Sequence, residues 1–215
     1  MQSICLTAGN DPRKSRFKKG KGRRRSYSEK SAWSNHLVWF LGAMCFVAFL
    51  SEGAILDWGA LFLRDNKGMD KAFAGAGYAC LSIAMAVMRL AGDRIISQVN
   101  SKSVVLYGSI IAFFGYMCLL FAPWISVTLL GFVMIGAGVA NIVPVFFSAA
   151  GSLRNVNSSD AISVTGTLGY AGQLAGPAVL GVLENHFTLP ISLFRTGVLL
   201  LLTGVIYRMA KVNNR

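Results

Sequence analysis

Charged residues are scarce in this chain of 215 residues. Asp, Glu, Lys and Arg make up 14% of the sequence, whereas hydrophobic residues make up 54%. A soluble domain typically carries about 25% charged residues, so this composition excludes an ordinary soluble domain. It also excludes disorder, because so much apolar surface cannot remain in water. We therefore predict an integral membrane protein, whose length allows about six or seven spanning helices of roughly 20 residues.

Cysteine and histidine are also rare. The cysteines are Cys5, Cys45, Cys80 and Cys118. They form no C-x-x-C pair, so we expect neither a disulfide framework nor a zinc site. The two histidines, His36 and His186, lie at the ends of predicted segments, and no H-E-x-x-H or G-x-S-x-G motif occurs. We therefore predict that the chain is not an enzyme and needs no cofactor.

Six apolar runs are separated by polar or charged breaks. They cover residues 37–63, 72–90, 104–121, 125–151, 161–183 and 190–207. Each run is long enough to cross the hydrocarbon core as a helix, and helices satisfy their own backbone groups in lipid. The sequence therefore predicts an all-α membrane protein with six transmembrane helices in one bundle, residues 37–210. Residues 1–36 are expected to form a basic, disordered cytoplasmic tail, and residues 211–215 a cytoplasmic C-terminus.

The basic residues are distributed unevenly. Residues 1–36 contain ten Lys and Arg but only two acidic residues. With both termini in the cytoplasm, the cytoplasmic segments carry 17 Lys and Arg, and the opposite segments carry four. The positive-inside rule therefore places both termini on the cytoplasmic side of the inner membrane. Residues 11–30 are expected to be solvated or to contact anionic lipid, with no nucleic-acid partner.

The six runs show signs of an internal repeat. The tripeptide Gly-Tyr-Ala occurs at residues 77–79 in the second run and at residues 169–171 in the fifth. In an inverted 3+3 repeat these positions are equivalent. Polar groups concentrate in the first, second, fourth and fifth runs, which predicts four helices that line a cavity and two peripheral helices.

Two acidic residues, Glu52 and Asp57, lie inside the first apolar run. Counted back from Leu63, Glu52 lies roughly 16 Å into the membrane and Asp57 roughly 9 Å. A carboxylate in lipid is costly, so both are expected to face the bundle interior or a water-filled cavity. Glu52 is a candidate substrate or proton site. Asp57 is a candidate gate or ion-pair residue, although it reaches Arg64 only if the helix bends; alternatively, both acids lock helices together.

The fourth run contains Asn141 and Pro144, which follow a glycine-rich stretch. Pro144 frees a backbone carbonyl and bends the helix. Asn141 is therefore a candidate to hydrogen-bond a substrate, and the alternative is a hydrogen bond between helices.

In the fifth run, glycine recurs at residues 169, 172 and 176, before Pro177. Such a stripe is typical of a helix-packing face, so Gly172, Gly176 and Pro177 are predicted to pack. Tyr170 and Gln173 are candidates to line a cavity.

The second run closes on Arg89, Asp93 and Arg94. Opposite charges this close together at a helix end can form an interhelical charge network at the cytoplasmic face. The alternative is a set of ordinary loop charges.

Several of these strings resemble the major facilitator superfamily of transporters. The string R-x-x-G-D-R at residues 89–94 resembles its loop motif between the second and third helices. The strings EGAILDW (52–58), ANIVP (140–144) and GYxxxLxxP (169–177) are similar to the bacterial fucose-permease-like branch. The similar region, roughly residues 37–210, corresponds to the C-terminal six-helix half of a twelve-helix fold. The N-terminal half is absent, and residues 95–102 lack the usual glycine followed by basic residues.

The resemblance implies a function and roles for individual residues. Glu52, Asn141 and Gln173 would face the central cavity. Arg89, Asp93 and Arg94 would stabilise one access state. It further implies that the chain moves a small solute by alternating access, coupled to protons or potential through Glu52. A working carrier would need a second six-helix unit, either a separate N-terminal half or a second copy. A non-transporting remnant or one half of a split gene are the alternatives.

Overall fold

The computed structural model describes residues 32–153 and 156–210, and the predictions for residues 1–31 and 211–215 lie outside these ranges. Within them, a short 3₁₀ helix, η2 (Ala32–Ser34), precedes seven α-helices. These are α1 (His36–Lys67), α2 (Ala76–Gln98), α3 (Ser101–Phe121), α4 (Ile125–Val139), α5 (Ile142–Gly151), α6 (Ser158–His186) and α7 (Leu189–Met209). The prediction of an all-α chain is confirmed.

Several of the helices are suited to a membrane. Four stretches of the described chain are long and apolar enough to cross one, namely α1, α3, α4 together with α5, and α7. Helix α2 contributes a shorter apolar stretch, Ala76–Gly92. Helix α6 is 29 residues long but richer in serine, threonine and glycine. The apolar stretches make this a multi-pass membrane protein.

Most helix boundaries differ from the prediction by a few residues, and two segments differ more. The second apolar run was expected to end at residue 90, but α2 continues to Gln98. That prediction was wrong because isolated charges do not end a helix when no proline follows them. Residues 125–151 were expected to form one bent helix, but they form two, α4 and α5, separated at Ala140 and Asn141. Pro144 has no N–H to donate to the carbonyl of Ala140, which explains an interruption at this position.

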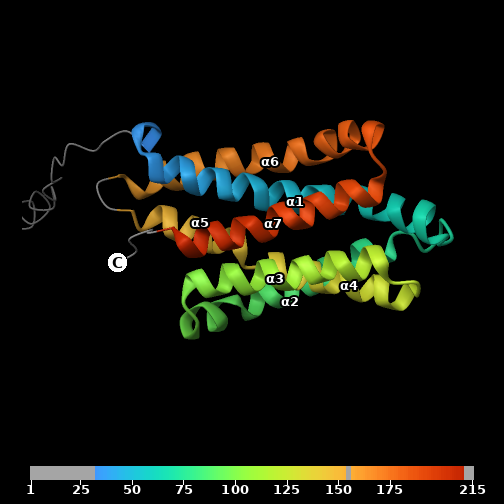
Figure 1. Ribbon diagram of the computed structural model, residues 1–215. Coiled ribbons are helices and arrows are strands. Elements are labelled where there is room, and N and C mark those ends of the chain that lie inside the picture. The colour runs from blue at the N-terminus through green and yellow to red at the C-terminus, as the bar shows by residue number, and fades with distance from the viewer. Residues whose placement is uncertain (1–31, 154–155, 211–215) are drawn as a thin grey trace, which may run out of the picture.

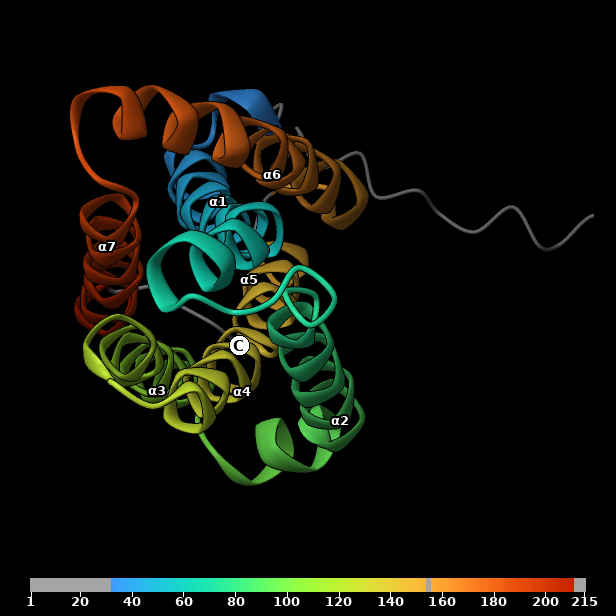
Figure 2. The same ribbon diagram turned by 90° about the vertical axis from the view of Figure 1, so that its right-hand side faces the viewer.

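Consecutive helices run back and forth along the bundle, with α5 continuing in the direction of α4 (Figure 1). The beginning of α1 and the end of α7 therefore lie at the same end of the molecule, here called the terminal end. Seen along the bundle in Figure 2, α3 and α7 lie on one side, α1 and α4–α5 in the middle and α2 on the other side, while α6 runs across the top of the view, over α1. Helix α4 packs mainly on α2 and α3, whereas α5 packs mainly on α1 and α6.

Close backbone approach joins α3 to α4. A Cβ atom added to Gly115 would lie 2.8 Å from the carbonyl oxygen of Gly131, and one added to Gly131 would lie 2.7 Å from the carbonyl oxygen of Gly115. Two turns away, Gly108 and Gly138 are paired in the same reciprocal way. In lipid, where apolar burial contributes little, such contacts are a main source of helix association. The four glycines therefore fix α3 and α4 against each other.

At both ends of the bundle, side chains form hydrogen bonds with backbone groups at the helix termini. Asn35, Asn100 and Asn157 cap α1, α3 and α6 at the terminal end, each accepting a backbone N–H two residues later at 2.9–3.1 Å. At the opposite end, Lys67 Nζ donates to the carbonyl oxygens of Leu120, at 3.1 Å, and Ala122, at 2.7 Å. Lys67 thereby ties the end of α1 to the end of α3.

Candidate functional site

Glu52 and Arg89 form an ion pair inside the bundle. Glu52 lies near the middle of α1, and its side chain is only 7% exposed. Arg89 Nη2 of α2 donates to Glu52 Oε1 at 3.4 Å. The second carboxylate oxygen, Oε2, is buried without a hydrogen-bond partner among the described residues. The carboxylate is thus compensated in charge by Arg89, but its hydrogen-bonding capacity is only partly used.

Arg89 lies on α2, and this helix continues well beyond Arg89. Its side chain is 46% exposed, in contrast to that of Glu52. Helix α2 extends more than two turns past Arg89, to Gln98. Arg89 therefore stands away from the helix end, and its contact with Glu52 links the residue assigned to the cytoplasmic network with the candidate proton site.

Asn141 lies at the interruption between α4 and α5 and contacts α2. Its Nδ2 donates to the carbonyl oxygen of Met88 at 3.2 Å. A Cβ atom on Gly92 would collide with Asn141 Oδ1, so glycine allows α2 to lie this close. Met88 and Gly92 flank Arg89 along α2. This contact matches the alternative in which Asn141 forms a hydrogen bond between helices. Asn141 thereby positions the turn of α2 that carries Arg89.

A second polar contact lies beside Glu52 on α1. Tyr116 of α3 is fully buried, and its hydroxyl donates to the carbonyl oxygen of Ser51 at 3.2 Å. The Ser51 hydroxyl is buried without a partner among the described residues. Tyr116 was not predicted, because the third run was expected to be peripheral; a phenol in a long apolar run was the available signal.

The candidate packing residues of α6 lie against α1. A Cβ atom on Gly172 would collide with the carbonyl oxygen of Phe46, and one on Gly176 would lie 2.8 Å from that of Leu50. These contacts place the glycine stripe at the α1–α6 interface, which is the most extensive helix contact of the described chain.

Pro177 makes a different contribution to this interface. Because it lacks an N–H, the carbonyl of Gln173 has no helical donor, and this oxygen faces Gly53, whose added Cβ would lie 2.7 Å away. Trp58 Nε1 of α1 donates to the carbonyl oxygen of Pro177 at 3.2 Å. The backbone carbonyls of Gln173 and Pro177 thus contribute to the packing of α6 on α1. Pro144, by contrast, is itself exposed, one turn after the α4–α5 interruption.

Three other candidates lie outside the buried pair. Asp57 is exposed, and Arg64, considered as its partner, instead binds Asp65 at 2.5 Å. Tyr170 is 59% exposed and stacks on Phe49, with ring centroids 5.2 Å apart. Gln173 is half-buried.

The other two members of the predicted charge network lie further along α2. Arg94 is exposed, and the side chain of Asp93 lies outside the described part of the structure. Whether they act with Arg89 therefore stays a prediction.

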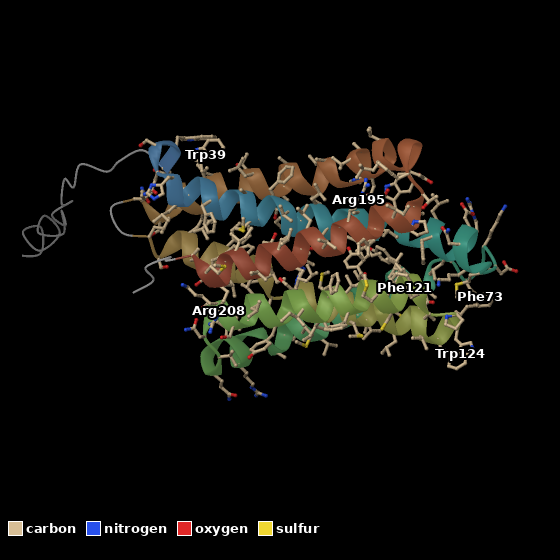
Figure 3. All side chains as sticks on the ribbon, in the orientation of Figure 1. Trp39, Phe73, Phe121, Trp124, Arg195 and Arg208 are labelled. Carbon is tan, nitrogen blue, oxygen red and sulfur yellow. The ribbon has the colours of Figure 1, made fainter. Side chains whose placement is uncertain are left out.

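A wide depression of about 680 Å³ lies far from this pair, where α1, α6 and α7 meet at the end opposite the termini. Its lining includes Asp65 and Glu184. Asp65 is already bound to Arg64 through two hydrogen bonds, at 2.5 and 2.9 Å. Figure 3 shows Arg195, which lies over the Phe187 ring at 3.8 Å, near this end. The depression is open and Asp65 is already paired with Arg64, so the buried pair is the better candidate site.

A bundle of apolar helices with an ion pair at mid-height and a helix interrupted beside it is the architecture of a polytopic membrane protein. The chain belongs to the Major Facilitator Superfamily, whose family model matches residues 3–177.

Three curated relatives are similar to this chain. An uncharacterized MFS-type transporter of Yersinia pestis is 40% identical over 77% of this chain and 43% of its own length. An uncharacterized transporter of Sinorhizobium fredii is 29% identical over 82% of this chain and 47% of its own length. Membrane protein MosC of Rhizobium meliloti is 28% identical over 80% and 41%, respectively. The chain thus spans less than half the length of the curated relatives it matches.

Proposed function

We propose that this chain forms the C-terminal six-helix half of a major facilitator transporter of the fucose-permease-like branch, and that it moves a small solute by alternating access. The observation that carries the proposal is the Glu52–Arg89 pair at mid-height beside the α4–α5 interruption. Ionisable groups inside a membrane bundle mark substrate or ion pathways. Interrupted helices mark the binding region of many secondary transporters.

The packing of the helices supports an inverted 3+3 repeat. In such a repeat, α1 corresponds to α4–α5, α2 to α6, and α3 to α7. Helix α1 packs on α6 and α7, and α4 packs on α2 and α3, which are the equivalent partners. This pairing supports the expectation that the two middle helices and the α2 and α6 flanks line the cavity, while α3 and α7 lie at the periphery.

Transport requires a second six-helix unit. The chain covers less than half of each matched relative, which supports a partner of similar size. This partner is either a separately encoded N-terminal half or a second copy of the chain. The family match begins at residue 3, so the basic tail would correspond to the loop that joins the two halves of a complete carrier.

The proposed location is the inner membrane, with both termini in the cytoplasm. The excess of Lys and Arg in the sequence segments assigned to the cytoplasm, most of it in residues 1–36, supports this orientation. Glu52 is proposed to carry the coupled proton, and the substrate is a small molecule.

Uptake by membrane vesicles tests the proposal. The chain is expressed alone and together with the reading frame directly upstream, and uptake of a panel of radiolabelled sugars and small acids is measured. We expect uptake by the pair, or by a dimer of the chain, and its loss in Glu52→Gln, because the amide cannot carry a proton. Glu184→Gln, which removes an acid at the far end of α6, is the matched control and is expected to keep uptake.

The alternative is a non-transporting remnant or one half of a split gene. Six further helices encoded directly upstream would identify a split gene. A stable monomer that shows no uptake, alone or with the upstream product, would contradict transport by this chain.

A further inference from the structure

We propose that the Glu52–Arg89 pair selects an anionic solute and moves it together with one proton: when Glu52 is protonated, Arg89 binds the anionic group of the solute. This inference rests on the proposed function and specifies the substrate class of the same site.

The geometry of the pair shows that Arg89 is available to a second anion. It makes a single contact with Glu52, at 3.4 Å, and nearly half of its side chain is exposed. The Arg64–Asp65 pair of the same chain is instead held by two hydrogen bonds, at 2.5 and 2.9 Å. A guanidinium offers five N–H donors in a fork that fits a carboxylate or phosphate. Arg89 gives only one of them to Glu52.

Glu52 can accept a proton at an oxygen that makes no hydrogen bond to the described residues. Its Oε2 is buried and has no partner among the described residues, while Oε1 carries the contact with Arg89. A proton from water bonds to a carboxylate oxygen and neutralises it. The electrostatic attraction between the two side chains is then lost, and Arg89 remains charged without an ionised carboxylate as its partner.

Few other titratable groups surround Glu52. On α1 itself, Cys45 interacts electrostatically with it, and Asp57 is exposed. From α3, Tyr116 reaches the Ser51 carbonyl. Helices α4 and α5 contain no titratable residue, and α6 contributes only Tyr170 between its terminal charges. On the facing side of α2, Arg89 is therefore the charge that responds to protonation of Glu52.

Charge balance then determines what the site can hold. In the resting state the negative Glu52 and the positive Arg89 sum to zero. After protonation the site holds neutral Glu52, positive Arg89 and the bound anion, which again sum to zero. A neutral solute would leave the guanidinium without a counter-ion inside a membrane, which is less favourable than binding an anion there. One proton and one monovalent anion therefore enter together, and the cycle moves no net charge.

Matched pairs of ligands test this inference on the purified full chain. The pairs are d-glucuronate with d-glucose and l-lactate with propane-1,2-diol, which differ chiefly in the carboxylate. Binding is measured calorimetrically at several pH values in two buffers of different protonation enthalpy. We expect at least one anion to bind while its neutral counterpart does not, with uptake of one proton per anion. Its affinity should fall about tenfold per pH unit above the titration of Glu52.

Variants separate the two charges. Glu52→Gln mimics the protonated state and should bind the anion with an affinity that no longer depends on pH. Arg89→Gln should abolish binding, while Arg89→Lys should retain part of it. Arg195→Gln removes a positive charge at the far end of the bundle and should bind as the native chain does. Circular dichroism and size-exclusion chromatography verify that each variant is folded.

Three results would overturn the inference: no binding of either anion, equal binding of an anion and its neutral counterpart, or retained anion binding in folded Arg89→Gln. Vesicle uptake of a neutral sugar together with any of these would leave the proposed function standing and remove only the anion selectivity. Anion binding with no uptake would support the anion selectivity and contradict the proposed transport function.

Discussion

Asn141 shows how a single polar side chain can determine the position of a helix. It interrupts the fourth span, and its amide donates to α2 one residue before Arg89. Its exposed fraction is only 5%, so the amide is withdrawn from solvent and committed to the neighbouring helix. We infer that Asn141 acts by placing Arg89.

Replacing Asn141 by alanine should therefore destabilise the bundle. Loss of the hydrogen bond to the Met88 carbonyl should reduce the free energy of unfolding by about 1 kcal/mol. Thermal unfolding in detergent, followed by circular dichroism, measures the change. Asn157→Ala, which removes an exposed cap of α6, is a comparison variant that should leave the Glu52–Arg89 contact intact. An unchanged midpoint in Asn141→Ala would show that the hydrogen bond contributes little.

At this scale the sequence predicted the interior carboxylate but not its partner. The cost of a charge in lipid was enough to place Glu52 inside the bundle. The pairing with Arg89 depends on where α1 and α2 approach each other, and no spacing along the chain encodes that approach. Arg89 was read together with Asp93 and Arg94 because the three are close in sequence, whereas its bonding partner lies 37 residues away.

At the scale of helices, the α1–α6 interface depends on small residues. Gly172 and Gly176 lie directly against carbonyl groups of α1. Gly166, in the same helix, is different: a Cβ added there would meet only the Phe147 ring, at 3.5 Å or more. The same helix thus provides both a sensitive and a tolerant glycine.

Gly172→Ala should destabilise the protein, whereas Gly166→Ala should not. The methyl group at residue 172 would force α1 and α6 apart, with an expected loss of about 2 kcal/mol. At residue 166 alanine gains helix propensity, up to about 1 kcal/mol. Thermal unfolding of both variants under identical conditions compares them directly. Equal midpoints would argue against close packing as the reason for the glycine stripe.

The helices themselves were largely predictable because hydropathy identifies long apolar runs. Their ends were less so: α2 passes through its charges, and the interruption falls three residues before Pro144 rather than at it. The reciprocal glycine contacts between α3 and α4 were missed. Gly108 and Gly115 are seven residues apart, as are Gly131 and Gly138, and this spacing is wider than the G-x-x-x-G pattern of a packing face.

For the whole molecule, large apolar side chains remain uncovered on every flank. Some lie on α2 and α6, such as Tyr78 and Leu174, which are 55% and 82% exposed. Others lie on the peripheral helices, such as Ile111 of α3 and Leu202 of α7, which are 42% and 48% exposed. Lipid is expected to cover α3 and α7, and the second six-helix unit is expected to cover α2 and α6.

Cysteine cross-linking distinguishes these two flanks. In a background without native cysteines, Tyr78→Cys and Leu174→Cys should form disulfide cross-links in native membranes, either with the same cysteine of a second copy or with a cysteine introduced into the facing helices of a partner half. Ile111→Cys and Leu202→Cys should remain monomeric under the same oxidant, because lipid surrounds them. Non-reducing electrophoresis gives the result. Cross-links through Ile111 or Leu202 alone would place the partner on the opposite flank and contradict the proposed assembly.

The interruption between α4 and α5 also divides the bundle into two mechanical units. Helix α4 belongs with α2 and α3, and α5 belongs with α1 and α6, while α7 touches both groups through α3 and α1. Glu52 belongs to one unit and Arg89 to the other. We propose that residues 140–141 act as a hinge and that the ion pair joins the two units across it. On the mechanism proposed above, protonation of Glu52 would release this contact and free Arg89 at the same time.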